Sequence, residues 1–370
     1  MDTDGSLEKA MNKVWKNMVG KRMYITGGIG SQGYAERFTV DNDLPVDRGY
    51  METCASVGLC FWAKRLLELY RRAEYADVME RALYNSVLVG WSLSGEEYFY
   101  TNTLHYKKTV TDYREDSKHL ENGRQRWFRC ACCPSNILRL VTNIQDYCLI
   151  VDSTGIYVNL YLQGQWMFEK GGKSVAVIMR TEYPYDGNII IRVQSGQEQM
   201  DFQLGLRIPQ WCKNYEIILN GKRLENVGKK EDGYVVLDKT WKGEETVFLK
   251  LAMPAEYIFS DRAIWDSVGK TALARGPIIY CQESVDYGTE GLEGLFYDLK
   301  SEITYEDGDG PLAGLKVLKT EGYRLQKSSG EQAYSAALPK FQKCRITAIP
   351  YYAWRNRGES DMDVWFPYRI

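Results

Sequence analysis

The chain has 370 residues, of which 44% are hydrophobic and 26% are charged. This composition is typical of a globular protein, and the length favours two or three hydrophobic cores over one. The formal net charge of −2 excludes the basic surface that binding to nucleic acid or to an anionic membrane requires. The sequence has neither a signal-peptide pattern at its N-terminus nor an apolar run near the roughly 18 residues of a membrane span, so a cytoplasmic location is expected.

Apolar residues recur with helical spacing through the first 150 residues. The spacing is that of amphipathic helices joined by long, glycine-rich loops. The predicted helices cover residues 7–19, 52–72 and 74–90. Pro134, a residue type favoured in the first turn of a helix, indicates one more helix, with Cys133 as its cap or as the last residue of the preceding loop. We therefore expect one helical domain over residues 1–150.

The glycine-rich run YITGGIGSQG, residues 24–33, is a poor match to a nucleotide-binding loop. Its glycines do not have the G-x-G-x-x-G spacing, and neither a Lys-Ser/Thr pair nor a βαβ pattern accompanies them. A backbone that bends sharply beside a functional site accounts for these glycines more economically.

Residues with metal-ligand chemistry stand in two short segments. The segment RCACCPSN brings Cys130, Cys132 and Cys133 close together, and Glu52 precedes Cys54 by two residues at the start of a predicted helix. Four of these side chains would supply three sulfur atoms and one oxygen, a tetrahedral set that Zn²⁺ accepts. They are Glu52, Cys54, Cys132 and Cys133. Packing of the cysteines as small hydrophobic residues is the alternative. Adjacent cysteines at a helix start favour the metal, because the helix dipole and a cation both stabilise thiolates.

After about residue 150 the hydrophobic period falls to two. Short β-branched segments alternate with Asp-Gly and Asn-Gly turns, which predicts antiparallel sheet. We expect two antiparallel β-sandwich domains, over residues 151–256 and 257–370. An arrangement in which the extreme C-terminus returns to the first of these domains is left open.

A series of sequence words runs from about residue 20 to the C-terminal region. The words are MYITGGIGS, AERF, DNDLP, YMETCASVGL, YADVMERALYN, SLSGEEYFY, WFRCACCPSN, RGPIIYC and PYYAWRNR. In this order they resemble the zinc-dependent β-L-arabinofuranosidases of glycoside hydrolase family 127, and the combination of ETCA with CACCP is highly specific. The resemblance implies a multidomain fold, α then β, in which the C-terminal part of an (α/α)6 barrel is followed by two antiparallel β-sandwich domains.

The resemblance also implies a retaining glycosidase with a cysteine as its nucleophile. Cys132 matches the nucleophile of the family and Glu36 matches its general acid/base. Glu52, Cys54 and Cys133 match the Zn²⁺ ligands that accompany Cys132. In this scheme the metal keeps Cys132 as a thiolate, and Glu36 protonates the leaving oxygen and then activates water.

Other implications of the resemblance concern the substrate and the partners. Glu80 and Tyr100 match residues that line the sugar pocket, whereas Cys130 has no assigned role. The implied substrate is a plant glycan with terminal β-L-arabinofuranosyl groups. Because family members carry a complete helical barrel and the chain matches only its last part, a separate helical chain or a homo-oligomer is expected to complete it.

Two other functions compete with the glycosidase. One is a catalytically silent zinc-binding fragment that acts as a binding or assembly module through its β-domains. The other is an oxidoreductase that uses the cysteine cluster. The oxidoreductase is less favoured, because no C-x-x-C motif lies in a βαβ setting.

Overall fold

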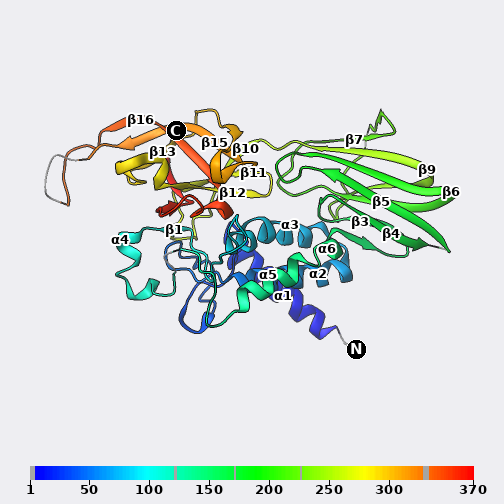
Figure 1. Ribbon diagram of the computed structural model, residues 1–370, viewed down its shortest axis with the longest axis horizontal. Coiled ribbons are helices and arrows are strands. Elements are labelled where there is room, and N and C mark those ends of the chain that lie inside the picture. The colour runs from blue at the N-terminus through cyan, green and yellow to red at the C-terminus, as the bar shows by residue number, and fades with distance from the viewer. Residues whose placement is uncertain (1–4, 121–122, 171, 226, 328–332) are drawn as a thin grey trace. The chain divides into compact units, whose positions relative to one another are not determined.

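The computed structural model describes residues 5–120, 123–170, 172–225, 227–327 and 333–370. Helices come first along the chain and strands dominate after them (Figure 1). The α-helices are α1 (Ser6–Lys21), α2 (Thr53–Tyr70), α3 (Ala73–Arg81), α4 (Lys108–Thr111), α5 (Cys132–Val141) and α6 (Gln145–Cys148). The predicted order of helices before strands is therefore confirmed, while the partial (α/α)6 barrel stays a prediction. None of the described helices has the combined length and apolar character that crossing a membrane demands.

The predicted helix over residues 74–90 is only partly a regular α-helix. After α3 the chain continues as a π-helical turn, Ala82–Val87, and a 3-10 turn, Leu88–Gly90. Gly27 lies against the start of this turn, because a Cβ atom at Gly27 would come within 2.7 Å of the Ala82 backbone. Gly27 also has a positive φ of 79°. Only glycine combines this conformation with so close an approach, so the sharp bend predicted for the glycine run is confirmed.

Contacts divide the chain into two compact units that are discontinuous in sequence. One unit comprises Met1–Ser56, Ala82–Ile137 and Ala255–Ile370. The other comprises Val57–Arg81 and Leu138–Pro254. The first 150 residues thus contribute to both units, a division that hydrophobic periodicity does not reveal.

The second unit contains an eight-stranded sheet among its described residues. Its strands are β2 (Leu149–Val151), β3 (Gly155–Val158), β4 (Gly164–Lys170), β5 (Lys173–Thr181), β6 (Asn188–Arg207), β7 (Tyr215–Leu219), β8 (Lys222–Arg223) and β9 (Tyr234–Leu251). The long strands β6 and β9 pair along most of their length (Figure 1). Asn220 and Gly221 both have positive φ in the two-residue turn between β7 and β8, which is the hairpin geometry that an Asn-Gly pair predicts.

The first unit contains a ten-stranded sheet among the residues that the structure describes. Its strands are β1 (His105–Tyr106), β10 (Ala255–Phe259), β11 (Lys270–Arg275), β12 (Ile278–Glu283), β13 (Leu295–Asp298), β14 (Thr304–Asp307), β15 (Lys316–Leu325), β16 (Phe341–Pro350), β17 (Met362–Asp363) and β18 (Phe366–Arg369). The order β12-β16-β15-β13-β18-β11 closes on itself, because β11 also pairs with β12. This ring is barrel-like, and the antiparallel β-sandwich predicted for residues 257–370 is not confirmed.

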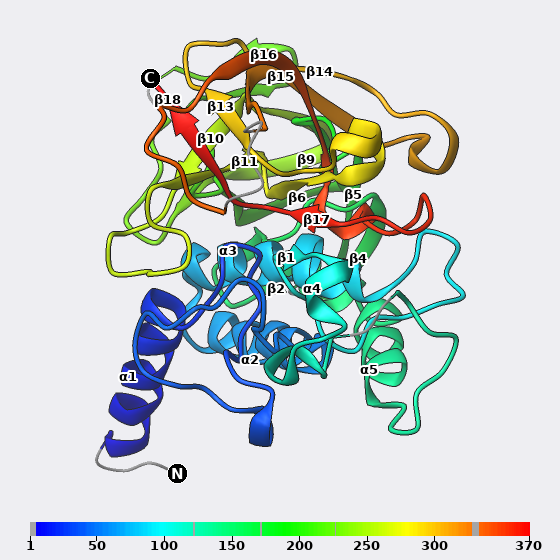
Figure 2. The same ribbon diagram turned by 90° about the vertical axis from the view of Figure 1, so that its left-hand side faces the viewer.

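Two features of the sheets differ from the sequence-based prediction. The pairs β3–β6 and β13–β18 are parallel, and alternation of apolar residues carries no information about strand direction. The C-terminal strand β18 lies between β13 and β11 in the ring, as Figure 2 shows in red. The extreme C-terminus therefore does not return to the sheet of residues 151–256, because its backbone hydrogen bonds go to β11 and β13.

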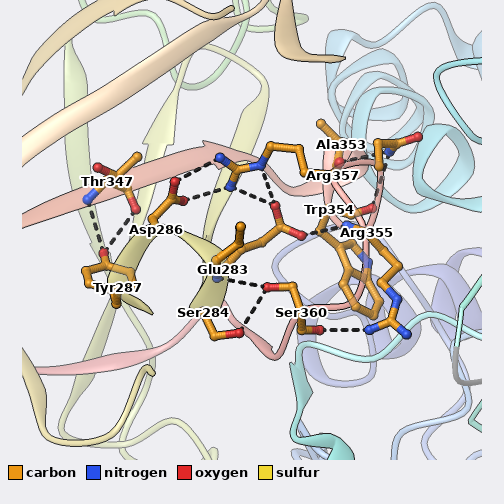
Figure 3. Close-up of polar contacts among 12 residues, drawn as sticks. Glu283, Ser284, Asp286, Tyr287, Thr347, Ala353, Trp354, Arg355, Arg357 and Ser360 are labelled. Atoms are coloured by element: carbon orange, nitrogen blue, oxygen red, sulfur yellow. Dashed lines mark hydrogen bonds and ion pairs between the residues drawn. The ribbon is translucent and has the colours of Figure 1, made fainter. Parts of the chain in front are cut away.

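A buried ion pair fixes the loop after β16 to the ring (Figure 3). Glu283, the last residue of β12, has no exposed side-chain surface and accepts hydrogen bonds from the Arg355 backbone nitrogen at 2.7 Å and from Arg357 Nη2 at 2.8 Å. Arg357 also bonds to Asp286, with Nη2 to Oδ2 at 2.7 Å. Burial raises the pKa of Glu283, so its ionised form depends on these donors.

We expect Arg357→Met to destabilise the protein by about 3–5 kcal/mol at pH 7, because it leaves the buried Glu283 carboxylate without its cation. A carboxyl group with a raised pKa in the folded state favours folding while it is protonated, and this contribution is lost as pH rises through that pKa. The destabilisation should therefore be smaller at pH 5 than at pH 7. Chemical denaturation at both pH values measures the effect.

The control is Arg223→Met, because the Arg223 side chain is 64% exposed and its contact with Glu216 is 3.4 Å long. This substitution should change the free energy of unfolding by less than about 1 kcal/mol. An Arg357→Met variant as stable as this control would show that the ion pair does not hold the loop.

Candidate metal and catalytic site

Two helix N-termini bring the predicted metal ligands together. Cys132 and Cys133 are the first two residues of α5, so the helix begins before Pro134 and Cys133 lies inside its first turn rather than at its cap. Glu52 directly precedes α2, and Cys54 is the second residue of that helix. Each helix start carries a partial positive charge, which stabilises thiolates and carboxylates placed there.

The four donor atoms converge as the sequence predicts. The Cys54 and Cys133 sulfurs lie 3.5 Å apart, and the Cys132 and Cys133 sulfurs 3.8 Å apart. Glu52 Oε1 is 3.4 Å from the Cys132 sulfur and 3.8 Å from the Cys133 sulfur. All four donor atoms lie within 4.8 Å of one another. A tetrahedral ion with Zn–S distances near 2.3 Å requires edges of about 3.5–3.8 Å, so the geometry of this group fits Zn²⁺.

Proton affinities in this group also favour a cation. Burial raises the pKa of Cys132 to about 12, and the hydrogen bond with Cys54 raises the pKa of Cys133. The same contact with Cys133 lowers the pKa of Cys54. Without a cation, burial and these contacts therefore favour the protonated forms of Cys132 and Cys133. A divalent cation replaces these protons, because it stabilises several thiolates at once.

Tyr100 contacts the predicted nucleophile directly. The Cys132 thiol donates to the Tyr100 hydroxyl oxygen at 3.2 Å, and the Tyr100 ring packs edge-on against Phe128 with 5.5 Å between ring centroids. The Tyr100 backbone oxygen accepts from Thr53 at 2.9 Å, next to the ligand pair of α2. Tyr100 thus lies beside the group of four donors, where a substrate that approaches Cys132 would meet it.

Glu36, the predicted acid/base, lies on a loop with an unusual backbone. Ala35 and Glu36 both have positive φ, at 57° and 50°, which is uncommon for residues other than glycine. The Tyr50 hydroxyl donates to Glu36 Oε1 at 3.0 Å. The ring of Tyr50 is T-shaped against Tyr100, with 6.4 Å between centroids. Two tyrosines therefore connect Glu36 to the sulfur of Cys132.

The loop that carries Tyr100 is held by the segment after β16. Trp354 stacks on Phe99, with ring centroids 5.0 Å apart and planes at 15°. The backbone nitrogen of Leu93 donates to Asn356 Oδ1 at 2.9 Å. Figure 3 shows Trp354 and its neighbours next to the buried Glu283. The C-terminal ring thus stabilises the position of the residue preceding Tyr100.

Glu80 lies in the second compact unit, where it belongs to a buried ion pair. Its side chain is 1% exposed, and that of Arg207 is fully buried. Both Arg207 terminal nitrogens donate to the Glu80 carboxylate. Tyr183 Oη and Trp211 Nε1 donate to the same carboxylate at 2.6 and 3.3 Å. The predicted contact between Glu80 and a sugar stays a prediction.

Sequence reasoning missed two residues of this site. Tyr50 and Asn136 both stand inside recognised words, YMETCASVGL and WFRCACCPSN, but their residue types are common in cores and helices. Their roles follow from partners far away in the sequence, Glu36 for Tyr50 and Cys54 for Asn136. Cys130 is exposed and is not part of the group of four donors.

Three domain families match consecutive parts of the chain. The β-L-arabinofuranosidase GH127 catalytic domain matches residues 1–146, the GH127 middle domain residues 155–253, and the glycoside hydrolase family 127 C-terminal domain residues 255–367. The three matches together cover nearly the whole chain and come from one family.

Individual relatives are longer than this chain. A non-reducing end β-L-arabinofuranosidase of Bifidobacterium longum subsp. longum is 32% identical over 98% of this chain and 56% of its own length. The crystal structure of a GH127 β-L-arabinofuranosidase from Geobacillus stearothermophilus T6 superposes with a TM-score of 0.95 at 40% identity, over 99% of this chain and 57% of that one. A further GH127 β-arabinofuranosidase structure has a TM-score of 0.88 at 32% identity, with the same coverage. The chain thus spans little more than half the length of these relatives.

We expect the protein to carry about one zinc ion per chain when it is purified under reducing conditions without chelator, because the four donors match its preferred geometry. Elemental analysis by mass spectrometry measures the content. Cys54→Ala removes one sulfur ligand and should leave most of the protein without zinc.

The matched control is Cys130→Ala, because Cys130 is an exposed cysteine of the same segment. It should retain the metal. A zinc content near zero in the unmodified protein, or full retention in Cys54→Ala, would contradict the assignment.

Proposed function

Because the chain belongs to glycoside hydrolase family 127, we propose that it is a retaining glycosidase that releases terminal β-L-arabinofuranosyl groups from plant glycans. The observation that carries this proposal is the position of Cys132, a partly exposed thiol within a Glu/Cys group that fits Zn²⁺. The likeness to β-L-arabinofuranosidases of similar architecture supports the choice of sugar.

The proposed reaction begins with attack of the Cys132 thiolate on the anomeric carbon. A sulfur–carbon bond forms, the glycosidic carbon–oxygen bond breaks, and Glu36 transfers its proton to the leaving oxygen. A zinc ion held by Glu52, Cys54, Cys132 and Cys133 would supply the positive charge that keeps the sulfur deprotonated near neutral pH.

The second half of the reaction restores the protein. Glu36, now a carboxylate, takes a proton from water while the water oxygen bonds to the anomeric carbon and the carbon–sulfur bond breaks. Two displacements give overall retention of configuration. The hydrogen bond from Tyr50 to Glu36 orients the carboxyl group in both steps.

Tyr100 and Glu80 are proposed to contact the sugar. The Tyr100 hydroxyl already lies 3.2 Å from the Cys132 sulfur, so a sugar that reaches this sulfur also reaches Tyr100. The Glu80 carboxylate is paired with Arg207 within its own compact unit and also accepts a hydrogen bond from Tyr183. A sugar hydroxyl that binds Glu80 would therefore share this carboxylate with protein donors.

The catalytically silent zinc-binding fragment remains the second candidate. The chain spans 56–57% of the length of two of its relatives, and the group of four donors can bind a metal ion whether or not the chain hydrolyses a sugar. Metal binding without hydrolysis would identify this alternative.

Two substitutions test the proposed chemistry. Cys132→Ser should abolish hydrolysis of an aryl β-L-arabinofuranoside without loss of the fold, because a hydroxyl is a much poorer nucleophile than a thiolate.

Glu36→Gln should keep more activity on the aryl substrate than on a natural glycan, because an aryl leaving group needs little protonation. Rate measurements on both substrates test these expectations, and circular dichroism shows whether each variant is folded. Equal losses on the two substrates in Glu36→Gln would contradict the role of Glu36.

The apolar surface of α1 supports a proposed helical partner. Leu7 is 68% exposed and Val14 is 57% exposed on this helix. We expect the chain to self-associate or to bind a separate helical polypeptide that corresponds to the N-terminal part of the longer relatives. Light scattering, together with the aryl-arabinofuranoside assay in the presence and absence of such a polypeptide, tests this expectation. A monomer that hydrolyses the substrate unaided would contradict it.

A further inference from the structure

The three sulfur atoms of the candidate metal site have different hydrogen-bond partners. Cys132 donates a hydrogen bond to the Tyr100 hydroxyl oxygen at 3.2 Å, whereas Cys54 accepts one from the side-chain nitrogen of Asn136 at 3.1 Å. Cys133 is fully buried, and its contacts are with the other donors of the group and with the Tyr100 backbone oxygen. Burial does not explain the difference between Cys54 and Cys132, because both are partly exposed.

Asn136 reaches Cys54 from the other helix of the site. It lies on α5, four residues after Cys132 and three after Cys133, so it is on the same side of the helix as this cysteine pair. Cys54 lies on α2, and the amide of Asn136 therefore links the two helices at the sulfur atom. A thiolate is an acceptor, so the amide nitrogen and not its oxygen faces it.

Helix stability alone does not account for an asparagine at this position. Asn136 is the fifth residue of α5, beyond the N-cap position where asparagine is favoured. Within a helix, asparagine is less favourable than alanine. The hydrogen bond to the Cys54 sulfur is therefore the interaction that explains an asparagine at position 136.

We propose that Asn136 is a positioning residue that holds Cys54 in the orientation needed for metal binding. Cys54 is the one sulfur ligand that α5 does not provide, so its place in the group depends on contacts across the two helices. The N–H···S hydrogen bond fixes its side chain and offsets part of the negative charge of its thiolate. The inference rests on the metal site of the proposed function but not on glycosidase activity.

The test measures metal affinity and the number of bound sulfurs. Competition with a chromophoric chelator gives the zinc affinity, and the thiolate-to-metal charge-transfer absorption of the Co²⁺-substituted protein reports on sulfur ligation. For Asn136→Ala we expect zinc affinity to fall by roughly 10–100-fold, with weaker charge-transfer absorption per bound Co²⁺. Asn136→Leu, which has nearly the shape of asparagine but no N–H, should behave in the same way.

The matched control is Ser135→Ala, which changes the neighbouring residue of the same helix. The Ser135 hydroxyl donates to the Ala131 backbone oxygen at 2.8 Å, so this substitution leaves the sulfurs untouched. It should retain both affinity and absorption. Thermal unfolding of the metal-free Asn136→Ala variant should occur at the same temperature as that of the unmodified protein or higher, because alanine favours the helix.

Unchanged zinc affinity in both Asn136 variants would overturn the inference, as would an equal loss in Ser135→Ala. Failure of the unmodified protein to bind zinc would overturn the metal site itself. A specific loss in the Asn136 variants of a protein without arabinofuranosidase activity would support the inference while contradicting the proposed function.

Discussion

Charge compensation at one small site is the constraint on which the first compact unit depends. Three thiols and one carboxyl group lie within 4.8 Å of one another, and if all were ionised they would repel one another strongly. Shared protons or a divalent cation must balance this charge, and two helix N-termini, those of α2 and α5, supply part of the balance. The first turn of each helix carries donors of the site, Cys54 on α2 and Cys132 on α5.

Parts of the chain far from this site in the sequence contribute to its geometry. The buried pair of Glu283 and Arg357 anchors the segment after β16 to the closed ring. From that segment Trp354 stacks on Phe99, the residue before Tyr100. The segment after β16 therefore has a physical connection to the sulfur of the proposed nucleophile, although Trp354 follows Tyr100 by more than 200 residues. This explains why residues 255–370 share a compact unit with the metal ligands.

The sequence predicts those parts of the site whose chemistry is local. Two short motifs contain the four donors, Glu52 with Cys54 in one and Cys132 with Cys133 in the other. Cysteines and a carboxylate at such close spacing are uncommon, so their convergence on one site is predictable. Tyr50 and Asn136 were not predictable, because both types are common and act on partners 14 and 82 residues away. The order of helices and strands follows from the spacing of the hydrophobic residues along the sequence. Closure of the ring does not, since it depends on the pairing of β11 with β12 and on parallel strand pairs.

The separation between Glu36, the proposed acid, and Cys132, the proposed nucleophile, has a chemical reason. A carboxylic acid in direct contact with a thiolate would donate its proton to the sulfur, and both groups would then be in the wrong state for the proposed reaction. In this structure Glu36 contacts Tyr50 and Cys132 contacts Tyr100, and the rings of the two tyrosines lie 6.4 Å apart between centroids. Phenols keep their protons near neutral pH, and burial raises the pKa of both tyrosines further. The two tyrosines therefore lie between the proposed acid, Glu36, and the proposed nucleophile, Cys132, and keep their own protons near neutral pH.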